Sequence, residues 1–478
     1  MAKQSTEGIT VKKEEDISEW YEQVCLKGKL AEFSKVKGSI VIRPNGYAIW
    51  EKIQGYFNKN IIEKSGAENA YFPLFIPESF FHKEAEHAKG FSPEVAWIDK
   101  KLTGDGERLA IRPTSETIMY DSYSRWIRSY KDLPLRINQW CNVVRWETKA
   151  TRLFLRSREF LWQEGHCVYE TEKECDKETN WYINEYKRLA EELLAIPIIV
   201  GKKTDKEKFA GAKYTLTIEA FMPDGKALQC GTSHNLGQGF AKAFNINFEG
   251  KDRKSHLPWQ NSWGLSTRLI GGMTMIHSDD KGLVLPPRIA KNKVAIIPIL
   301  IKGKEEKVLK KAKEIQKSLK KYNTILDDDK DYSPGFKFNK YELEGIPLRI
   351  EIGPRDLEKN QIVLARRDTS EKQDIKIKNI EKSIKETLET MKKEMFDKAK
   401  KELTNKITKT NDIKEFKKII NNKQIALVPF CGRVECEEEI KDNTGASSRC
   451  YIDDKSTSEK CIKCGQEKAK WIYFSKSY

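Results

Sequence analysis

Charged and aromatic side chains alternate in VVRWETKATRLFLRSREFLWQEGH, the stretch that occupies residues 143–166. Residues two apart on a β-strand share a face, so Arg145 lies beside Glu147, and Phe160, Trp162 and Glu164 line one side of a returning strand. One interpretation is a hairpin whose solvent face carries cross-strand ion pairs. Because aromatic faces are seldom left in water, the pattern also indicates charged groups that look into a cleft.

Four cysteines near the end of the chain have the spacing of metal ligands. Cys431 and Cys436 form C-x₄-C, and Cys461 and Cys464 form C-x₂-C. Two close pairs of thiolates suit tetrahedral Zn²⁺ better than they suit free thiols in a protein of the cytosol. Cys450 is left over as a non-ligand. We therefore predict a structural zinc site with no catalytic role, since no open coordination position is implied.

The composition limits the class of protein. The chain has 478 residues, 38% of them hydrophobic and 10% aromatic, which supports real cores and argues against disorder. The net charge of +16 suggests a polyanionic partner such as a nucleic acid, although a lysine-biased genome would give the same excess. We find no secretion signal and no apolar run of about 20 residues, so we expect a cytoplasmic protein without membrane segments or disulfides.

Residues 1–285 have the pattern of one large α+β unit. AYFPLFIP (70–77) and INQWCNVVRW (137–146) are typical of strands, and 174–195 has the apolar spacing of a surface helix. The segment GLVLPPRIAKNK (282–293) then favours a linker, because consecutive prolines cannot continue a helix.

Two further units are predicted. Strand and helix patterns alternate over residues 293–395, which indicates a compact α/β domain. One helix there has its apolar face at Val308, Ala312, Ile315, Leu319 and Tyr322, and a later one at Ile384, Leu388, Met391 and Met395. Residues 400–478 combine a charged connector with the cysteine-rich end.

Five segments, in this order, resemble the class II aminoacyl-tRNA synthetases: AYFPLFIPESFF (70–81), RPTSE (112–116), the hairpin of 143–166, LQCGTSHNLGQ (228–238) and NSWGLSTRLIGGM (261–273). Within that class the chain is most similar to the prolyl-tRNA synthetase family of the archaeal/eukaryotic type. The resemblance implies an α+β class II catalytic core with an antiparallel sheet and helices, an α/β anticodon-binding domain and a small zinc-binding α+β domain.

The resemblance also implies the residues that activate the amino acid. A guanidinium can hold two anions in fixed geometry, so Arg145 is expected to bridge the ATP α-phosphate and the amino-acid carboxylate, with Arg268 on the γ-phosphate side. These two are the expected catalytic residues. The expected ATP contacts are Arg145, Glu147, Arg156, Ser157, Phe160, Gln229, Thr232, Ser266 and Arg268, with Gln229 also serving Mg²⁺ through ATP. Ser157 and Ser266 stand where the family usually has Thr.

A second set of residues resembles the family's proline pocket. It consists of Thr114, Glu116, Arg145, Trp162, Glu164, Phe209 and His234. A carboxylate suits this pocket because the substrate nitrogen arrives as a cation. Taken alone, residues 114–116 are more typical of a helix N-cap followed by a first-turn acid, and both interpretations can hold. The prediction for His234 rests on its place in QCGTSH, and Tyr478 resembles the family's C-terminal tyrosine, which tucks toward the active site.

The implied activity is ATP-dependent attachment of proline to tRNA(Pro) through prolyl-adenylate, with ATP, Mg²⁺ and structural Zn²⁺ and no membrane partner. The segment around Pro73 resembles the motif that forms the family's homodimer interface. Single-stranded anticodon bases are read by side chains, and the expected readers are Glu351, Arg355, Arg366 and Arg367. About 100 residues separate Glu164 from Asn261, too few for the editing insertion of bacterial-type relatives. Threonyl- or glycyl-tRNA synthetase, or a synthetase-like RNA-binding protein that does not aminoacylate, are the alternatives.

Overall fold

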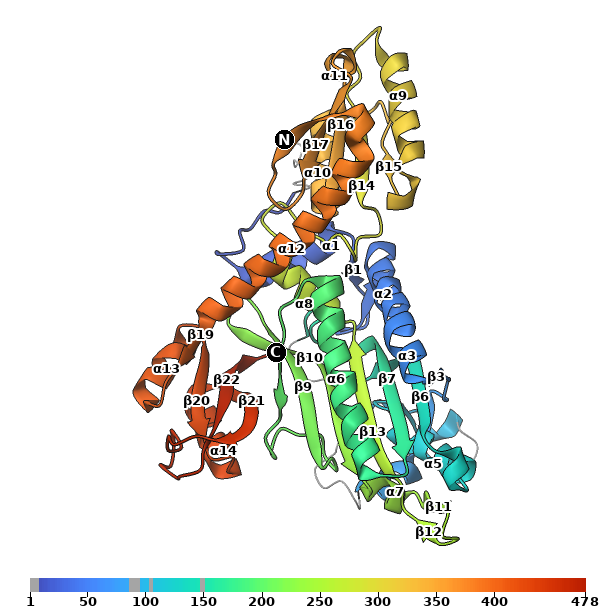
Figure 1. The fold of residues 1–478 in the computed structure, drawn as a ribbon, viewed down its shortest axis with the longest axis vertical. Coiled ribbons are helices and arrows are strands. Elements are labelled where there is room, and N and C mark those ends of the chain that lie inside the picture. The colour runs from blue at the N-terminus through green and yellow to red at the C-terminus, as the bar shows by residue number, and fades with distance from the viewer. Residues whose placement is uncertain (1–7, 86–94, 103–105, 147–150) are drawn as a thin grey trace.

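The computed structural model describes residues 8–85, 95–102, 106–146 and 151–478. Figure 1 shows a large sheet with helices in the lower half, a compact unit above it, and a C-terminal group of strands and helices at the lower left. The long helix α12 (Ile380–Lys406) runs from the upper unit to the C-terminal group. This helix continues across residues 395–400, so the domain boundary predicted there falls inside one element.

The central sheet has eleven strands in the order β19-β20-β22-β21-β8-β9-β10-β13-β7-β6-β3. Its core strands are β3 (Glu68–Asn69), β6 (Leu135–Val144), β7 (Glu159–Tyr169), β8 (Ile199–Lys202), β9 (Tyr214–Phe221), β10 (Lys226–Gly237) and β13 (Trp259–Ser266). The C-terminal strands are β19 (Ile407–Lys409), β20 (Ile425–Phe430), β21 (Ser447–Ser456) and β22 (Lys470–Ser477). Tyr451 pairs with Lys202 across β21 and β8, so the two regions form one continuous sheet, which the sequence did not predict.

Helix α6 (Glu172–Leu194) covers one face of this sheet. It begins at Thr171, whose side chain forms a capping box with Glu174, and it confirms the helix expected over 174–195. Ser233 on β10 donates its hydroxyl to the carbonyl of Thr179 on α6 at 2.8 Å. Because side chains alternate along a strand, the neighbours of Ser233 point to the opposite face, which carries the candidate site.

The upper unit contains the five-stranded sheet β15-β14-β16-β17-β18. Its strands are β14 (Val294–Pro298), β15 (Ile325–Leu326), β16 (Leu348–Ile352), β17 (Gln361–Arg366) and β18 (Lys372–Lys376), and its helices include α9 (Glu305–Ser318), α10 (Pro334–Leu343) and α11 (Pro354–Glu358). The helical face predicted around Val308 is buried in its core, as are Ile384 and Leu388 of the second predicted face. Met391 and Met395 of that second face cluster instead with Ala195 and Val284, outside the upper unit. The predicted α/β architecture is confirmed.

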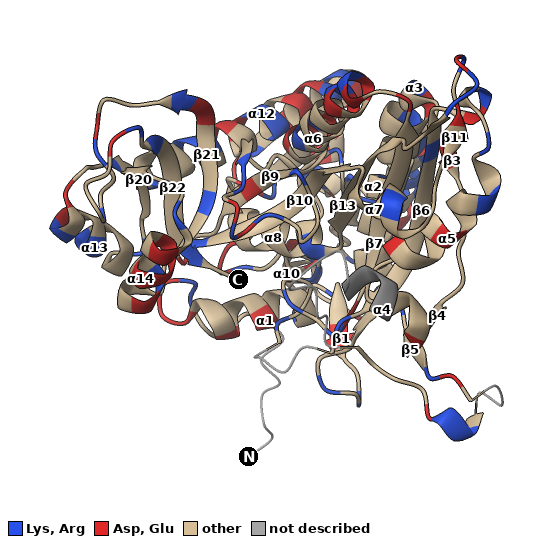
Figure 2. Ribbon diagram, turned by 90° about the horizontal axis from the view of Figure 1, so that it is seen from below, with Lys and Arg blue, Asp and Glu red and all other residues tan. Residues whose placement is uncertain are grey.

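The remaining elements surround the core sheet and end the chain. The helices are α1 (Ile17–Lys27), α2 (Pro44–Phe57), α3 (Glu63–Ser65), α4 (Glu78–Ala85), α5 (Glu116–Trp126), α7 (Gly239–Ala243), α8 (Arg268–His277), α13 (Ile413–Asn421) and α14 (Val434–Thr444). The short strands are β1 (Ala31–Phe33), β2 (Ile40–Ile42), β4 (Phe75–Pro77), β5 (Leu109–Ile111), β11 (Phe248–Glu249) and β12 (Ser255–His256). Basic and acidic residues alternate along α6 and α12 in Figure 2, as on solvated helix faces. Among the described residues, no helix combines the length and apolar character that crossing a bilayer requires.

Candidate active site

A cleft of about 470 Å³ opens on the face of the core sheet that α6 leaves uncovered. The predicted residues that line it are Thr114, Glu116, Arg145, Phe160, Trp162, Glu164, Phe209, Gln229, Thr232, His234, Ser266 and Arg268. Strand register explains this gathering, because Glu164 on β7 lies opposite Gly264 on β13, which lies opposite Thr232 on β10. Glu147 lies outside the described residues.

At one end of the cleft a buried network holds Glu164. Its Oε1 accepts hydrogen bonds from the Ser115 hydroxyl and from Gln139 Nε2, the latter at 3.0 Å. Its Oε2 lies 3.1 Å from His166 Nε2, and His166 Nδ1 lies 3.0 Å from the Tyr120 hydroxyl. Burial by itself would raise the pKa of Glu164, but the hydrogen bonds and charge of His166 and the neutral donors outweigh it and lower that pKa.

The first turn of α5 supplies a second carboxylate to the same end. The helix begins at Glu116, as the N-cap interpretation of residues 114–116 requires, but the Ser115 hydroxyl makes no cap bond. Ser115 donates to Glu164 instead, and the Thr114 hydroxyl donates to Glu116. Both hydroxyls therefore serve carboxylates in the cleft, and Glu116 is 4% exposed.

His234 closes this end on the β10 side. Its Nδ1 lies 2.9 Å from the hydroxyl of Thr215, and its ring lies 4.8 Å from the ring of Phe209. Burial lowers the pKa of His234 to about 3, so the imidazole is neutral near pH 7. A neutral ring against an aromatic ring provides an apolar wall with one polar edge, a surface suited to the ring of a small cyclic substrate.

Arg145 lies between the two ends of the cleft. Its Nε donates to the carbonyl of Pro113 at 3.1 Å, and its guanidinium lies 5.6 Å from the ring of Phe160 and 5.4 Å from that of Trp162. Trp162 is fixed in turn by a bond from its Nε1 to the Cys141 sulfur at 3.1 Å. This aromatic flank holds the guanidinium in one orientation, as a group that bridges two anions needs.

Positive charge gathers at the other end. Arg268 is the first residue of α8, and its guanidinium donates to the carbonyls of Leu155 at 3.1 Å and Gln229 at 3.3 Å. Burial, followed by the nearby charges of Arg145 and Arg156, lowers the pKa of Arg268. Three guanidinium groups close enough to influence one another make a site for a polyphosphate.

Arg156 and Ser157 lie beside the cleft and do not line it. The backbone of Arg156 pairs with that of Arg152 at 2.7 Å, which closes the turn between β6 and β7. Ser157 is 6% exposed. Tyr478 reaches the same turn, because Arg152 Nη1 lies 3.4 Å from its hydroxyl, and that hydroxyl donates to Asp224 at 2.6 Å.

The four predicted metal ligands come together in the C-terminal region. The sulfur atoms of Cys431, Cys436, Cys461 and Cys464 all lie within 4.8 Å of one another, a spacing that fits a tetrahedral Zn²⁺. Cys450 is buried elsewhere, against Gly201. The donor set is chemically suited to zinc. Cys431 follows β20, Cys436 lies in α14, and Cys461 and Cys464 lie between β21 and β22.

Comparisons with known proteins cover the whole chain. Residues 99–277 match the tRNA synthetase class II core domain (G, H, P, S and T), 293–387 the anticodon binding domain, and 413–478 the prolyl-tRNA synthetase C-terminal family. "Proline--tRNA ligase" of Acetoanaerobium sticklandii is 50% identical over 473 residues, 97% of each chain, and "Proline--tRNA ligase 2" of Bacillus cereus is 47% identical over 484 residues, all of both. The crystal structure of prolyl-tRNA synthetase from Cryptosporidium parvum with halofuginone and AMPPNP superposes with a TM-score of 0.93 at 41% identity, over 99% of this chain and 98% of that one.

This chain belongs to the prolyl-tRNA synthetase family. Its relatives are matched over their full length, so the predicted class II fold and three-part layout are confirmed. Between β7 and β13 lie only α6, α7 and strands β8 to β12, all within the described residues, and no editing domain stands there. The threonyl, glycyl and non-synthetase alternatives lose their support.

The four anticodon candidates occupy different settings in the upper unit. Glu351 is 6% exposed and pairs with Arg349 at 3.0 Å and Lys372 at 2.9 Å, while Arg355 is exposed on α11. Arg366 binds Asp368 at 2.8 Å and also binds Glu394. Arg367 donates hydrogen bonds from both terminal nitrogens to Asp279 of the core. Arg366 and Arg367 bind acids outside the five-stranded sheet, whereas the partners of Glu351 lie on β16 and β18 of that sheet, so Glu351 and Arg355 are the candidates that we carry forward.

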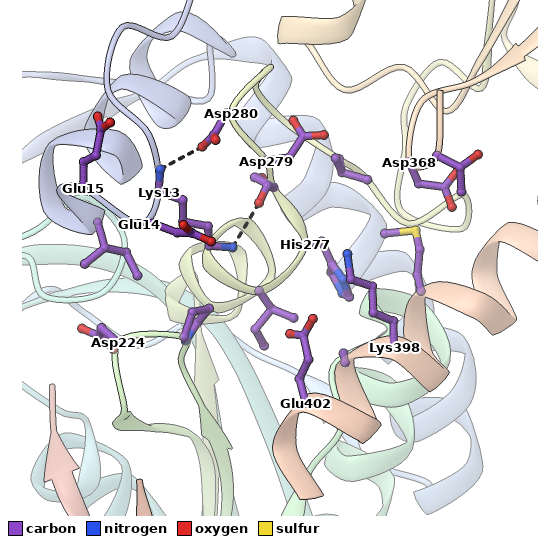
Figure 3. A pocket seen from close by; sticks show the side chains of 18 of the residues that line it. Lys13, Glu14, Glu15, Asp224, His277, Asp279, Asp280, Asp368, Lys398 and Glu402 are labelled. Carbon is purple, nitrogen blue, oxygen red and sulfur yellow. Dashed lines mark hydrogen bonds between the residues drawn. The ribbon is translucent and has the colours of Figure 1, made fainter. Parts of the chain in front are cut away.

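A second cleft, of about 920 Å³, lies where the N-terminal segment, the end of α8 and α12 meet (Figure 3). Protein groups already engage its polar lining: Asp280 accepts the backbone N–H of Lys13 at 2.8 Å, and Asp279 binds Arg367. The Lys13 ammonium donates to the carbonyls of Met275 and Ser278, and burial lowers its pKa to about 8. None of the predicted site residues in the described part of the chain lines this cleft.

The structure adds cleft residues that the motifs did not single out, chiefly His166, Glu207, Thr215 and Ser262. The alternation of residues 160, 162 and 164 continues to His166, so extending the pattern by two residues would have found it. Between Glu164 and His166, Gly165 leaves room for the ring of Trp263, which would lie 2.1 Å from a Cβ at that position. Thr215 carries no such signal, because its role follows from the pairing of β9 with β10.

Proposed function

We propose that this protein attaches proline to tRNA(Pro) in two steps, through a prolyl-adenylate. The observation that carries the proposal is one cleft with two carboxylates at one end and clustered guanidinium groups at the other. A cationic amino-acid nitrogen and an anionic triphosphate would bind at opposite ends, which brings the substrate carboxylate and the α-phosphate together between them. The chemistry then depends on positioning and charge neutralisation and requires no protein nucleophile.

Individual roles follow from the positions in the cleft. Glu116 and Glu164 would accept from the imino group of proline, with Thr114, Trp162, Phe209 and His234 around its ring. Arg145 would hold the carboxylate and the α-phosphate together, and Arg268 the γ-phosphate side. Phe160, Ser266, Arg156, Ser157 and Glu147 complete the proposed ATP contacts. Gln229 and Thr232 would support the Mg²⁺ that accompanies ATP, and this ion would neutralise phosphate charge.

Three features belong to the proposal beyond the cleft. The Cys431 cluster would hold one structural zinc ion, which metal analysis of the purified protein can test. Tyr71, Phe75 and Trp126 are 69%, 46% and 48% exposed around the segment of Pro73, and these apolar surfaces support a homodimer, which sedimentation can test. Glu351 and Arg355 would contact the anticodon of tRNA(Pro), and we place the protein in the cytoplasm.

Proline-dependent exchange of pyrophosphate into ATP tests the activity directly. We expect stimulation by proline and none by threonine or glycine at equal concentration. Arg145→Ala should lower the exchange rate at least about 10³-fold, because removing one group that stabilises charge in the transition state costs 10²–10³ and Arg145 is proposed to serve two anions. Arg125→Ala, an exposed arginine of α5 paired only with its neighbours Asp121 and Ser122, is the control. Normal exchange in Arg145→Ala would overturn the assignment.

A further inference from the structure

The proline end of the cleft contains two buried carboxylates and an imidazole in close contact. Ligand atoms of Glu116, Glu164 and His166 all lie within 4.8 Å of one another, and the three residues are 4%, 2% and 1% exposed. Two anions that close in a water-poor site repel, and one of them tends to take up a proton. A carboxylic acid would offer a cationic substrate no full counter-charge, so something must keep Glu164 ionised beside Glu116.

His166 is placed to do this for Glu164. An ionised carboxylate can only accept hydrogen bonds, so the contact of 3.1 Å between His166 Nε2 and Glu164 Oε2 requires the proton to be on Nε2. The ring cannot turn away, because its Nδ1 meets the Tyr120 hydroxyl at 3.0 Å and Tyr120 is fully buried on α5. The backbone carbonyl of His166 also accepts from Tyr123 at 3.0 Å.

We propose that His166, oriented by Tyr120, is a positioning residue for proline: it holds Glu164 as an anion so that the imino cation finds a counter-charge in the cleft. This inference rests on the proposed function. His166 itself does not touch the reacting atoms, and its effect passes through Glu164.

The surrounding groups support these roles, in which Glu164 supplies the counter-charge and His166 keeps it ionised. The titratable and charged groups that face Glu164 or His166 are Glu116, Tyr120 and Tyr123 on α5, Cys141 on β6, and His234 on β10. The Cys141 thiol and the Ser115 and Gln139 side chains are neutral donors. Burial would lower the pKa of His166, yet the bond and charge of Glu164 and the charge of Glu116 raise it, which fits a cationic ring between two acids.

The test compares four variants by pyrophosphate exchange over pH 5 to 9. We expect His166→Ala to raise the KM for proline about tenfold or more, since a hydrogen bond to a charged group is lost, with the KM for ATP changed less than about twofold. His166→Gln, which keeps an N–H donor, should recover part of this loss, and Tyr120→Phe should raise the proline KM about threefold. Tyr123→Phe removes an equally buried hydroxyl that bonds only a backbone carbonyl, and it should leave the proline KM unchanged.

The pH profile separates positioning from mere stability. Without His166 the pKa of Glu164 rises, so the acid limb of kcat/KM for proline should move to higher pH in His166→Ala and stay in place in Tyr123→Phe. An unmoved limb with an unchanged proline KM would overturn the inference. If His166→Ala does not fold, the same comparison between Tyr120→Phe and Tyr123→Phe decides. Failure of the wild-type enzyme to respond to proline would instead refute the proposed function.

Discussion

Two glutamates, Glu219 and Glu164, are fully buried on the cleft side of the core sheet, and their charges have different partners. Glu219 on β9 binds Lys203 Nζ at 2.8 Å and Arg449 Nη2 at 2.8 Å, so two cations face one anion. Its Oε1 also accepts from Thr217, whose strand partner is Thr232 of the cleft. Glu164 has one imidazole, neutral donors and a second carboxylate nearby.

The difference separates a structural carboxylate from a binding one. Arg449 belongs to β21 of the C-terminal region, whereas Lys203 follows β8 of the core, so Glu219 fastens the two regions where their strands join. A buried charge with full compensation has little left to offer a ligand. Glu164 is compensated in part, which leaves negative charge for a cation that enters the cleft.

The largest effect is expected from Glu164→Gln. The amide keeps the size of the side chain but removes the charge, and kcat/KM for proline should fall about 10³-fold, equivalent to about 4 kcal/mol. The free energy of unfolding should change by only about 1 kcal/mol, because the amide retains hydrogen bonds and His166 can release its proton. Pyrophosphate exchange and urea unfolding measure the two quantities. Equal losses in both would erase the distinction between the two glutamates.

Glu219→Gln should show the opposite pattern, with a loss of stability and proline kinetics within about tenfold of wild type. The paired cations lower the pKa of Glu219 to about 2 despite its burial, from an ordinary value of 4.5. That shift corresponds to about 3 kcal/mol of stability at pH 7.

The pH dependence of the unfolding free energy tests whether the charge of Glu219 stabilises the fold. A depressed carboxyl pKa stabilises the fold above pH 4.5, and this contribution is lost as the pH falls toward 2. The gap in unfolding free energy between wild type and Glu219→Gln should therefore shrink between pH 5 and pH 3 in urea titrations. A gap that stays constant over this range would show that Glu219 does not act through its charge.

Sequence patterns located Glu164 and missed the partners of Glu219 for a physical reason. Glu164 lies in a strand whose alternation is local, and Arg145, Phe160 and Trp162 lie within twenty residues of it. Glu219 and Arg449 are 230 positions apart, and only the pairing of β21 with β8 brings them together. Periodicity likewise predicted β6 and β7, the helix over 174–195 and the α/β unit, whereas the strand expected over 70–77 is limited to Phe75–Pro77 and lies outside the core sheet. No local pattern encodes which sheet edge the C-terminal strands extend.

The anticodon candidates show the same limit. Arg366 and Arg367 are adjacent in a basic segment, yet they bind acids on different elements. Arg366 binds Glu394 on α12, and Arg367 binds Asp279 after α8. Residue type alone does not distinguish an arginine that binds RNA from one that joins two domains. The choice of partner depends on tertiary packing.

A third ion pair extends the comparison to a pair that water can reach. Arg367 and Asp279 join the upper unit to the core with two bonds of 2.8 and 2.6 Å, but the Asp279 side chain is 41% exposed. Arg367 lowers the pKa of Asp279 against the opposing effect of burial. Because water screens the pair, Arg367→Ala should cost only about 1 kcal/mol of stability, far less than Glu219→Gln.

Lys304→Ala is the matched control, since Lys304 and Glu358 form a solvent-exposed pair of 3.2 Å in the same upper unit. It should change the unfolding free energy by less than about 0.5 kcal/mol. Arg367→Ala should also slow aminoacylation of tRNA(Pro) more than proline-dependent pyrophosphate exchange, because only the tRNA must span both units. If both variants lose as much stability as Glu219→Gln, burial does not set the strength of these pairs, and the contrast between the two glutamates needs another cause.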